Sequence, residues 1–219
     1  MIKKKLIKNA KKIDIFLINF LKRQKKSMLV KPMKYGVISG GKKIRSTVAL
    51  DAGKIFNLSE KKLINICAAI ECIHSYSLIH DDLPCMDNDK IRRGKPATHI
   101  KFGEASAVLA GSSLLTLAFE IITDKKYILS AKIKNEIVSA LASCSGHTGI
   151  AEGQELDLKF ENKNKNINQI IDMQKKKTGK LFNFCLYAVG VVANLKTREK
   201  FFLSKLGEEI GLLFQLADD

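Results

Sequence analysis

A helical spacing of apolar residues runs through nearly the whole chain and constrains the fold more than any other feature. Between residues 2 and 25, apolar side chains recur every three or four positions and lysines fill the opposite face, a pattern typical of an amphipathic helix. No segment alternates between apolar and polar residues as a half-buried strand does. The sequence therefore predicts an all-α protein with helices near residues 2–25, 43–56, 59–82, 103–123, 127–144, 147–159, 168–194 and 198–219.

Glycine, proline or polar residues interrupt this spacing, which predicts loops at residues 33–42, 83–97 and 162–168. No internal repeat or change of composition marks a boundary, so residues 1–219 are expected to form a single all-helical domain. The longest apolar runs, at 13–21 and 186–195, fall short of the roughly 18–20 residues that cross a membrane. Stable membrane insertion is therefore not expected.

Charge and cysteine content narrow the class of protein and its compartment. The 38 Lys and Arg against 22 Asp and Glu give a formal net charge of +16. The lysines are spread from end to end without an interleaved platform of aromatic residues and arginines, so nucleic acid is not the expected partner. We interpret the charge as solvated helix surface with an attraction for a small polyanionic substrate. Five cysteines without a C-x-x-C pair, and no export signal, indicate reduced thiols in the cytoplasm.

A cluster of four carboxylates stands between Asp81 and Asp89. Such a cluster is unfavourable without a cation, and carboxylate oxygens are the ligands that Mg²⁺ prefers. Asp81 and Asp87 would point about 240° apart on a continuous helix. Pro84 disfavours helix at the residue before it, so we expect the helix to end between the two aspartates and let them converge. A solvated acidic loop is the structural alternative.

Basic residues near this cluster, and a glycine pair earlier in the chain, suit phosphate binding. Arg92 and Arg93 follow the aspartates and are suited to bidentate contact with phosphate oxygens. Residues 40–45 read Gly-Gly-Lys-Lys-Ile-Arg at an expected helix start, where free N–H groups and three cations favour an anion. Residues 214–219 read Phe-Gln-Leu-Ala-Asp-Asp, which places a second acid pair at the end of an apolar helix.

The order and spacing of these motifs resemble those of the trans-isoprenyl diphosphate synthases, in particular the bacterial short-chain branch that makes farnesyl diphosphate. The resemblance covers the chain from about residue 30, through residues 40–45, 71–94, 96–111, 149–157, 177–180 and 214–219. It implies an isoprenoid synthase-type helical bundle around a central cavity, with two aspartate motifs across its mouth. It also implies a Mg²⁺-dependent, homodimeric prenyltransferase that condenses isopentenyl diphosphate with dimethylallyl or geranyl diphosphate.

The resemblance further implies a role for each matching residue. The Mg²⁺ ligands would be Asp81, Asp82, Asp87 and Asp218, the last followed by Asp219. Isopentenyl diphosphate would bind to Lys42, Arg45, His74 and Arg93, and the allylic substrate to Arg92, Lys177, Thr178 and Gln215. The residues implied to be catalytic are Asp81, Asp82, Asp87, Lys177 and Thr178. An aromatic ring at Tyr76, five residues before Asp81, would stop chain growth at farnesyl diphosphate.

Three departures from the family's pattern stand out. Ser46 replaces the usual proline after Arg45, and Gly-Ser-Ser at residues 111–113 replaces the usual Gly-Asp; neither change removes a ligand. The sequence ends at Asp219, before the family's third aspartate, its downstream lysine and its closing helices. We therefore expect an incomplete family domain whose C-terminal helices are missing.

Other classes of protein share parts of this pattern. A class I terpene cyclase would use the aspartates but would not need Lys42, Arg45 and His74. A metal-dependent phosphohydrolase of the HD type is suggested by His80 and Asp81, but the chain contains only 4 histidines from which to draw further ligands. A geranylgeranyl diphosphate synthase, or a non-catalytic helical subunit that binds diphosphate, stays open as the alternative function.

Overall fold

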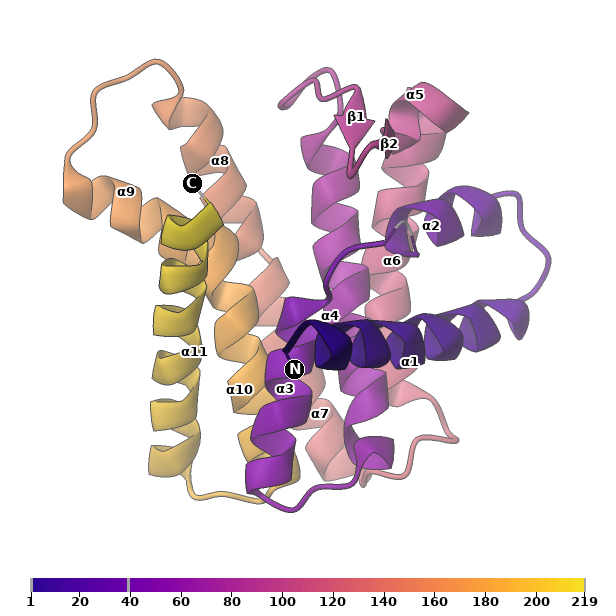
Figure 1. The fold of residues 1–219 in the computed structure, drawn as a ribbon, viewed down its shortest axis with the longest axis vertical. Helices are drawn as coiled ribbons and strands as arrows, with labels where there is room; N and C mark the ends of the chain where they lie inside the picture. The colour runs from indigo at the N-terminus through magenta and orange to yellow at the C-terminus, as the bar shows by residue number, and fades with distance from the viewer. Residues whose placement is uncertain (1, 39, 219) are drawn as a thin grey trace. The chain divides into compact units, whose positions relative to one another are not determined.

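Helices dominate the computed structural model, which describes residues 2–38 and 40–218, with only the backbone at Asp218 (Figure 1). In chain order they are α1 Ile2–Lys22, α2 Val30–Val37, α3 Ile44–Ile55, α4 Glu60–Asp81, α5 Thr98–Phe102, α6 Glu104–Thr123, α7 Ala131–Ser145, α8 Ile150–Phe160, α9 Ile167–Gln174, the π-helix η1 Lys175–Gly179, α10 Lys180–Val192 and α11 Thr197–Asp218. Within the described residues, β1 Ile91–Arg92 and β2 Lys95–Pro96 form the one small sheet. The prediction of an all-α fold is confirmed.

The chain divides into two compact units. The first comprises Met1–Thr47 and Ile64–Asp124, and the second comprises Val48–Leu63 and Lys125–Asp219. Helices α3 and α4 each contribute residues to both units. The expected single domain over residues 1–219 stays a prediction.

Helix α4 forms the core of the first unit. Ile66, Ile70 and Ile73 are fully buried, and so are residues on the other faces of the same helix. Asn65 ties α4 to α6 by donating from Nδ2 to the carbonyl oxygen of Ile121 over 2.9 Å. A helix that is apolar on all faces packs inside a protein. The C-terminal end of α4 therefore carries the chain from the core to the acidic turn at its edge.

Helix α2 lies where the sequence predicted a loop. We interpreted residues 33–42 as a loop because of their glycines, but α2 continues through Gly36 to Val37, so that prediction is wrong for residues 33–37. Gly36 serves close packing, since a Cβ there would lie 2.4 Å from Ile79 Cδ1 of α4. A glycine among these residues suggests a turn, but Gly36 instead allows α2 and α4 to pack closely.

A small hairpin occupies part of the predicted loop at 83–97. Strands β1 and β2 pair antiparallel, with Ile91 opposite Pro96 and Arg92 opposite Lys95. Arg93 and Gly94 connect them with φ values of +54° and +72°, the pair of positive angles that a two-residue type I′ turn requires. The hairpin was not predicted because its strands are too short to show alternation.

Helix α10 forms the core of the second unit, and Phe182, Phe184 and Cys185 on it are almost completely buried. Gly207 lets α11 approach α10 closely, because a Cβ there would lie 2.4 Å from the carbonyl oxygen of Phe182.

The continuous helix predicted over 168–194 is divided by the π-helix η1. Single π-turns within helices are frequent at functional sites.

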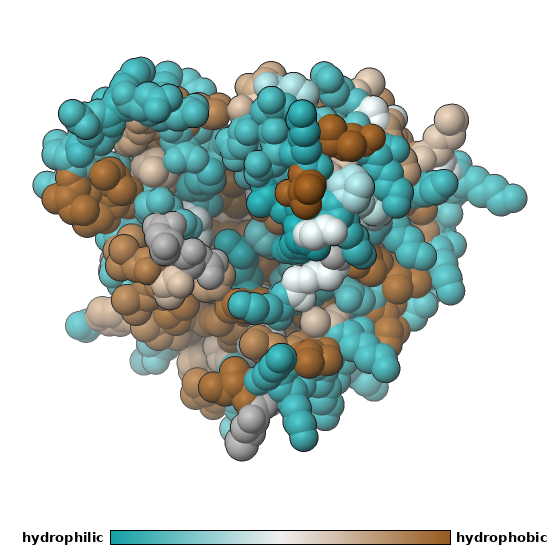
Figure 2. Space-filling view, turned by 45° about the horizontal axis from the view of Figure 1, so that its top comes forward, coloured by the Kyte–Doolittle hydropathy of each residue, from teal (hydrophilic) through white to brown (hydrophobic). Residues whose placement is uncertain are grey.

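The surface of the described chain carries both hydrophilic and apolar residues, and helices α4 and α6 are markedly apolar. On the face seen in Figure 2, hydrophilic residues cover much of the surface and apolar residues form patches. By length and composition, α4 and α6 are apolar enough to cross a membrane, with mean hydropathies of 1.2 and 1.7 over their most apolar stretches. The α4 stretch is 72% buried inside the protein and the α6 stretch 44%. Because buried core helices pass the same test, the absence of membrane insertion stays a prediction.

Replacing Gly207 with alanine should destabilise the fold. The added methyl group would meet backbone atoms of Phe182 and Asn183 at 2.4 and 2.8 Å. Overpacking costs about 1–3 kcal/mol, which exceeds the gain of up to about 1 kcal/mol from alanine's better helix propensity. Gly190→Ala is the control, since the nearest neighbours of its Cβ would be two side chains at 3.2 Å. Urea denaturation should show the lower free energy of unfolding for Gly207→Ala, and equal values would contradict this reason.

Candidate functional site

The first aspartate cluster lies at the C-terminal end of α4. The helix ends at Asp81, and the chain folds back so that the N–H of Asp87 donates to the carbonyl oxygen of Asp81 over 2.9 Å. Pro84 lies inside this turn, where we predicted the helix to break. The turn brings the backbones of the two aspartates together. A helix C-terminus carries negative partial charge, so carboxylates placed there favour a cation.

Asp82 is buried and engaged by an arginine. Arg92 Nε donates to Asp82 Oδ1 over 2.9 Å, and its Nη2 pairs with the same oxygen and with Asp89 Oδ2. Burial raises the pKa of the Asp82 carboxyl, and Arg92 counteracts that rise only in part. Burial acts to lower the pKa of Arg92, but Asp82 and Asp89 outweigh it, so the net shift is upward. Residues expected to hold a metal and an allylic diphosphate are thus paired with each other.

The oxygen donors of this turn suit a hard divalent cation. Asp81 is half-buried and Asp87 is exposed. Across the described residues, no three His, Cys, Asp or Glu side chains converge closely enough to hold a metal ion by themselves. Mg²⁺ is usually held by one or two carboxylates and completes its shell with water and substrate phosphate oxygens, so the donor set fits this ion. The side chain of Asp218 and the whole of Asp219 lie outside the described residues.

The glycine loop before α3 lies against Arg93. Gly40 and Gly41 have φ values of +97° and +98°, which favour glycine. Arg93 Nη1 donates to the carbonyl oxygen of Gly40 over 2.9 Å, and a Cβ on Gly41 would lie 2.7 Å from Arg93 Cζ. The loop therefore needs a glycine at residue 41 both for its backbone angle and for contact with the guanidinium.

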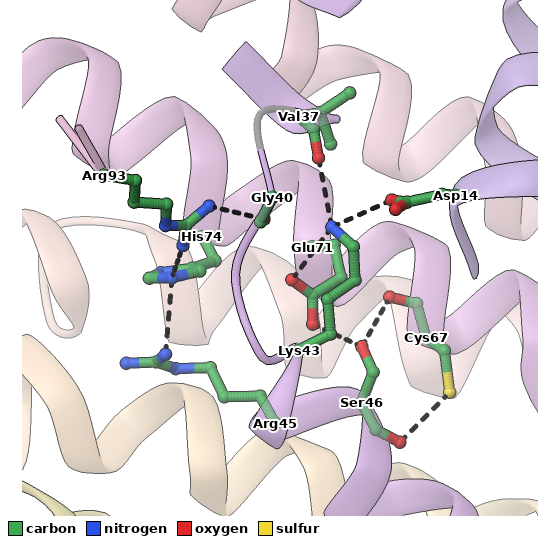
Figure 3. Close-up of polar contacts among 10 residues, drawn as sticks. All are labelled: Asp14, Val37, Gly40, Lys43, Arg45, Ser46, Cys67, Glu71, His74 and Arg93. Carbon is green, nitrogen blue, oxygen red and sulfur yellow. Dashed lines mark hydrogen bonds and ion pairs between the residues drawn. The ribbon is translucent and has the colours of Figure 1, made fainter. Parts of the chain in front are cut away.

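Lys43 holds the other end of this loop and points inward (Figure 3). Its side chain is 2% exposed, and its Nζ donates to the carbonyl oxygen of Val37 over 3.0 Å. The same atom lies 3.3 Å from Asp14 Oδ1 and 3.7 Å from Glu71 Oε2. The sequence predicts three cations for an anion here, but Lys43 is paired with the buried Glu71 and the partly exposed Asp14. Lys42 is exposed on the loop.

Arg45, His74 and Arg93 come together in what we call the arginine–histidine cluster. Figure 3 shows the His74 ring between the two guanidiniums, with Nε2 3.4 Å from Arg45 Nη1 and 3.3 Å from Arg93 Nη2. A guanidinium only donates, so Nε2 accepts and the imidazole is neutral. Burial, followed by the charges of Arg45 and Arg93, lowers the pKa of His74 well below its usual range. The cluster keeps two positive charges, which suits a diphosphate.

Predicted residues also meet in the second unit. Lys177, in η1, pairs with Asp157 of α8. The two backbones are close because Gly153 has no side chain: a Cβ there would lie 2.2 Å from Lys177 N. Asp157 belongs to a motif that we matched but to which we gave no role. Asp157 lies one helical turn after Gly153, and so on the face of α8 that the backbone of Lys177 approaches. This position in the sequence could have indicated its contact with Lys177.

Thr178 and Gln215 were expected to share the allylic site, and the structure brings them together. Thr178 Oγ1 donates to Gln215 Oε1 over 3.1 Å. Thr178 is buried and Gln215 is half-buried. The contact joins η1 to α11 at the residue that follows Lys177.

Comparison with known proteins decides which family shares these motifs. Residues 26–219 match the family model described as polyprenyl synthetase. The chain belongs to the polyprenyl synthetase family. The motif resemblance noted in the sequence is therefore confirmed.

Relatives and a solved structure extend this finding to the whole fold. The chain is 43% identical over 193 residues to farnesyl diphosphate synthase of Escherichia coli (strain K12), which covers 87% of this chain and 64% of that protein. It is 38% identical over 218 residues to farnesyl diphosphate synthase of Bacillus subtilis (strain 168), covering 99% and 72%. A crystal structure of an FPP/GFPP synthase from Zymomonas mobilis is 39% identical with a TM-score of 0.93, covering 100% of this chain and 80% of that one. The fold is of the isoprenoid synthase type, and the chain spans just under two thirds of the E. coli relative.

His74 should make folding depend on pH. Its pKa is lower in the folded protein than in the unfolded chain, so the unfolded state takes up the proton first as pH falls below about 6.5. This contribution to stability is complete above that pH and declines below it by up to about 1.4 kcal/mol per pH unit. Urea denaturation of the unchanged chain and of His74→Gln, which cannot titrate, should give curves that separate at low pH. Parallel curves would show that His74 is not held neutral.

Proposed function

We propose that this chain is a Mg²⁺-dependent prenyltransferase that condenses isopentenyl diphosphate with dimethylallyl and geranyl diphosphate to give farnesyl diphosphate. The observation that carries the proposal is the arginine–histidine cluster, in the same compact unit as the acidic turn after α4, in a chain of the polyprenyl synthetase family. Relatives named farnesyl diphosphate synthase, at 35% to 43% identity, support the product class.

Isopentenyl diphosphate is proposed to bind at the arginine–histidine cluster. Arg45 and Arg93 supply fixed donors, and their charges match the negative charge of the diphosphate. Lys42 is exposed on the adjoining loop and adds a third cation. Neutral His74 holds both guanidiniums as an acceptor, so it organises them without adding charge of its own.

The allylic diphosphate is proposed to bind at the acidic turn, with Mg²⁺ held by Asp81, Asp82 and Asp87. When bound, the metal neutralises the leaving diphosphate and so favours ionisation of the allylic carbon–oxygen bond. Arg92 orients Asp82 through their paired contact and is proposed to bind the same diphosphate. The double bond of isopentenyl diphosphate then attacks the allylic carbon, and the proton lost in forming the product passes to the departing diphosphate.

Lys177, Thr178 and Gln215, all in the second unit, are proposed to bind the allylic substrate. Asp157 fixes the ammonium of Lys177, and Gln215 fixes the hydroxyl of Thr178. The oxygens of Thr178 and Gln215 would stabilise positive charge developing on the allylic carbon, and the restrained ammonium of Lys177 would stabilise negative charge on the departing diphosphate. Both need little reorganisation because their positions are already fixed.

We propose further that the protein acts in the cytoplasm as a homodimer. In the described part of the chain, the buried cysteines Cys67, Cys72, Cys144 and Cys185 and the exposed Cys85 form no disulfide, as a reducing compartment allows. On α6, Val108 and Leu109 are 42% and 53% exposed, and a second copy of the chain would cover them.

Product formation tests the proposed reaction. The chain, incubated with isopentenyl and geranyl diphosphate and Mg²⁺, should form farnesyl diphosphate, detected by mass spectrometry, and EDTA should stop the reaction until Mg²⁺ is restored. Asp81→Ala should abolish turnover while helical circular dichroism stays nearly unchanged, since its carboxylate repels its neighbours. Glu155→Ala, which removes an exposed carboxylate of α8, is the control. Consumption of farnesyl diphosphate alone would indicate a terpene cyclase instead.

Tyr76 is proposed to limit the length of the product. It lies five residues before Asp81 on α4, or roughly 7.5 Å along the helix axis. The residue is buried, and its ring packs edge-on against His80 with centroids 5.7 Å apart. His80 is held in turn by donating from Nε2 to the carbonyl oxygen of Val108 over 3.1 Å. A ring restrained in this way is suited to block a growing chain.

Tyr76→Ala should lengthen the product from farnesyl to geranylgeranyl diphosphate or beyond, because the variant removes the ring and opens room deeper along α4. Tyr76→Phe is the matched control, since it keeps the ring and should keep the fifteen-carbon product. Chromatography of the dephosphorylated products measures the ratio of chain lengths. If Tyr76→Ala still stops at fifteen carbons, another residue limits the chain.

A further inference from the structure

Helix α1 lies outside residues 26–219 that match the family, yet it contacts the start of α3. Asn9 is buried and donates from Nδ2 to Thr47 Oγ1 over 3.4 Å. Asp14, further along the same helix, lies 3.3 Å from Nζ of Lys43. Because residues 43 and 47 flank the first turn of α3, the two contacts bracket the turn that carries Arg45.

Lys43 connects α1 to the glycine loop. Its backbone has a φ of +46°, in the left-handed region that is unfavourable for residues with a side chain. Side-chain contacts are therefore needed to hold the loop in this conformation, and Lys43 makes them to Asp14, Glu71 and the Val37 carbonyl oxygen (Figure 3). A buried ammonium is costly unless carboxylates surround it. Removing the Asp14 charge weakens the contact that fixes the loop.

The same turn of α3 also contacts α4 in two rows. In the inner row, Ser46 Oγ lies 2.5 Å from Glu71 Oε1, next to the Lys43 contact. In the outer row, Arg45 Nη1 lies 3.4 Å from His74 Nε2. Glu71 and His74 are three residues apart and so share a face of α4. The inner contacts thus set the position from which Arg45 reaches His74.

We propose that Asp14 is a positioning residue for isopentenyl diphosphate, acting through Lys43 on the glycine loop and on Arg45. The inference rests on the function proposed for the arginine–histidine cluster. Asp14 is unsuited to contact the substrate itself, because a carboxylate repels a diphosphate. Its side chain is 26% exposed and lies on the opposite side of the Lys43 ammonium from Arg93 and His74 (Figure 3). Its effect reaches the ligand through the placement of residues 40–45.

Binding of isopentenyl diphosphate to the full chain, measured by calorimetry without allylic substrate, tests this role. Asp14→Asn preserves side-chain size and removes the charge, and its Kd should rise at least about threefold. Asp14→Glu keeps the charge and should recover most of the affinity. Asp124→Asn is the matched control, since Asp124 pairs with Arg23 just beyond the end of α1 at 3.2 Å and is remote in sequence from the loop. Its Kd should equal that of the unchanged chain.

Steady-state kinetics separate positioning from a general loss of stability. Asp14→Asn should raise the KM for isopentenyl diphosphate and leave the KM for geranyl diphosphate unchanged. In a Lys43→Met background, Asp14→Asn should have no further effect on Kd, because the link is already broken. Equal Kd values for Asp14→Asn and the unchanged chain, or equal rises in both KM values, overturn the inference and leave the proposed function standing. Failure of the unchanged chain to bind isopentenyl diphosphate overturns both.

Discussion

The buried ammonium of Lys43 is the interaction on which the geometry of the first unit's site depends. One side chain brings together α1 through Asp14, α2 through the Val37 carbonyl oxygen and α4 through Glu71. Removing one partner of a buried ion pair costs about 3–5 kcal/mol, because the other charge is left uncompensated. Burial lowers the pKa of Arg93 overall, although the same carboxylates act favourably on its charge.

Glycines set how closely the elements of each unit approach. Gly36 admits Ile79, Gly153 admits the backbone of Lys177 and Gly207 admits the backbone of Phe182. At each of these positions a methyl group would overlap an atom of a neighbouring element, although alanine is the better helix former. At these three glycines, close packing between neighbouring elements therefore outweighs local helix propensity.

Helical spacing was sufficient to predict α1, α4, α6 and α11 approximately, because a helix that buries a face leaves a periodic record in its own sequence. Helical spacing failed at α2. Gly36 allows close packing against Ile79, and the pattern of neighbouring residues cannot reveal a contact with a residue so distant in the chain. Motif resemblance assigned Lys42, Arg45, His74 and Arg93 to one set, and the structure brings the last three together. It could not show that Lys43 turns inward while Lys42 does not, since adjacent lysines differ only in their tertiary surroundings.

The π-turn of η1 determines how far α10 is rotated about the helix axis relative to α9. The N–H of Lys180 donates to the carbonyl oxygen of Lys175, five residues back, where an α-helix would bond four residues back. Such a turn is equivalent to one extra residue in a helix, and each residue turns a helix by about 100°. Within this turn Lys177 pairs with Asp157 of α8, and the next residue, Thr178, donates to Gln215 of α11. Loss of one residue from this turn, even with every named side chain kept, would rotate α10 and its buried face relative to α9.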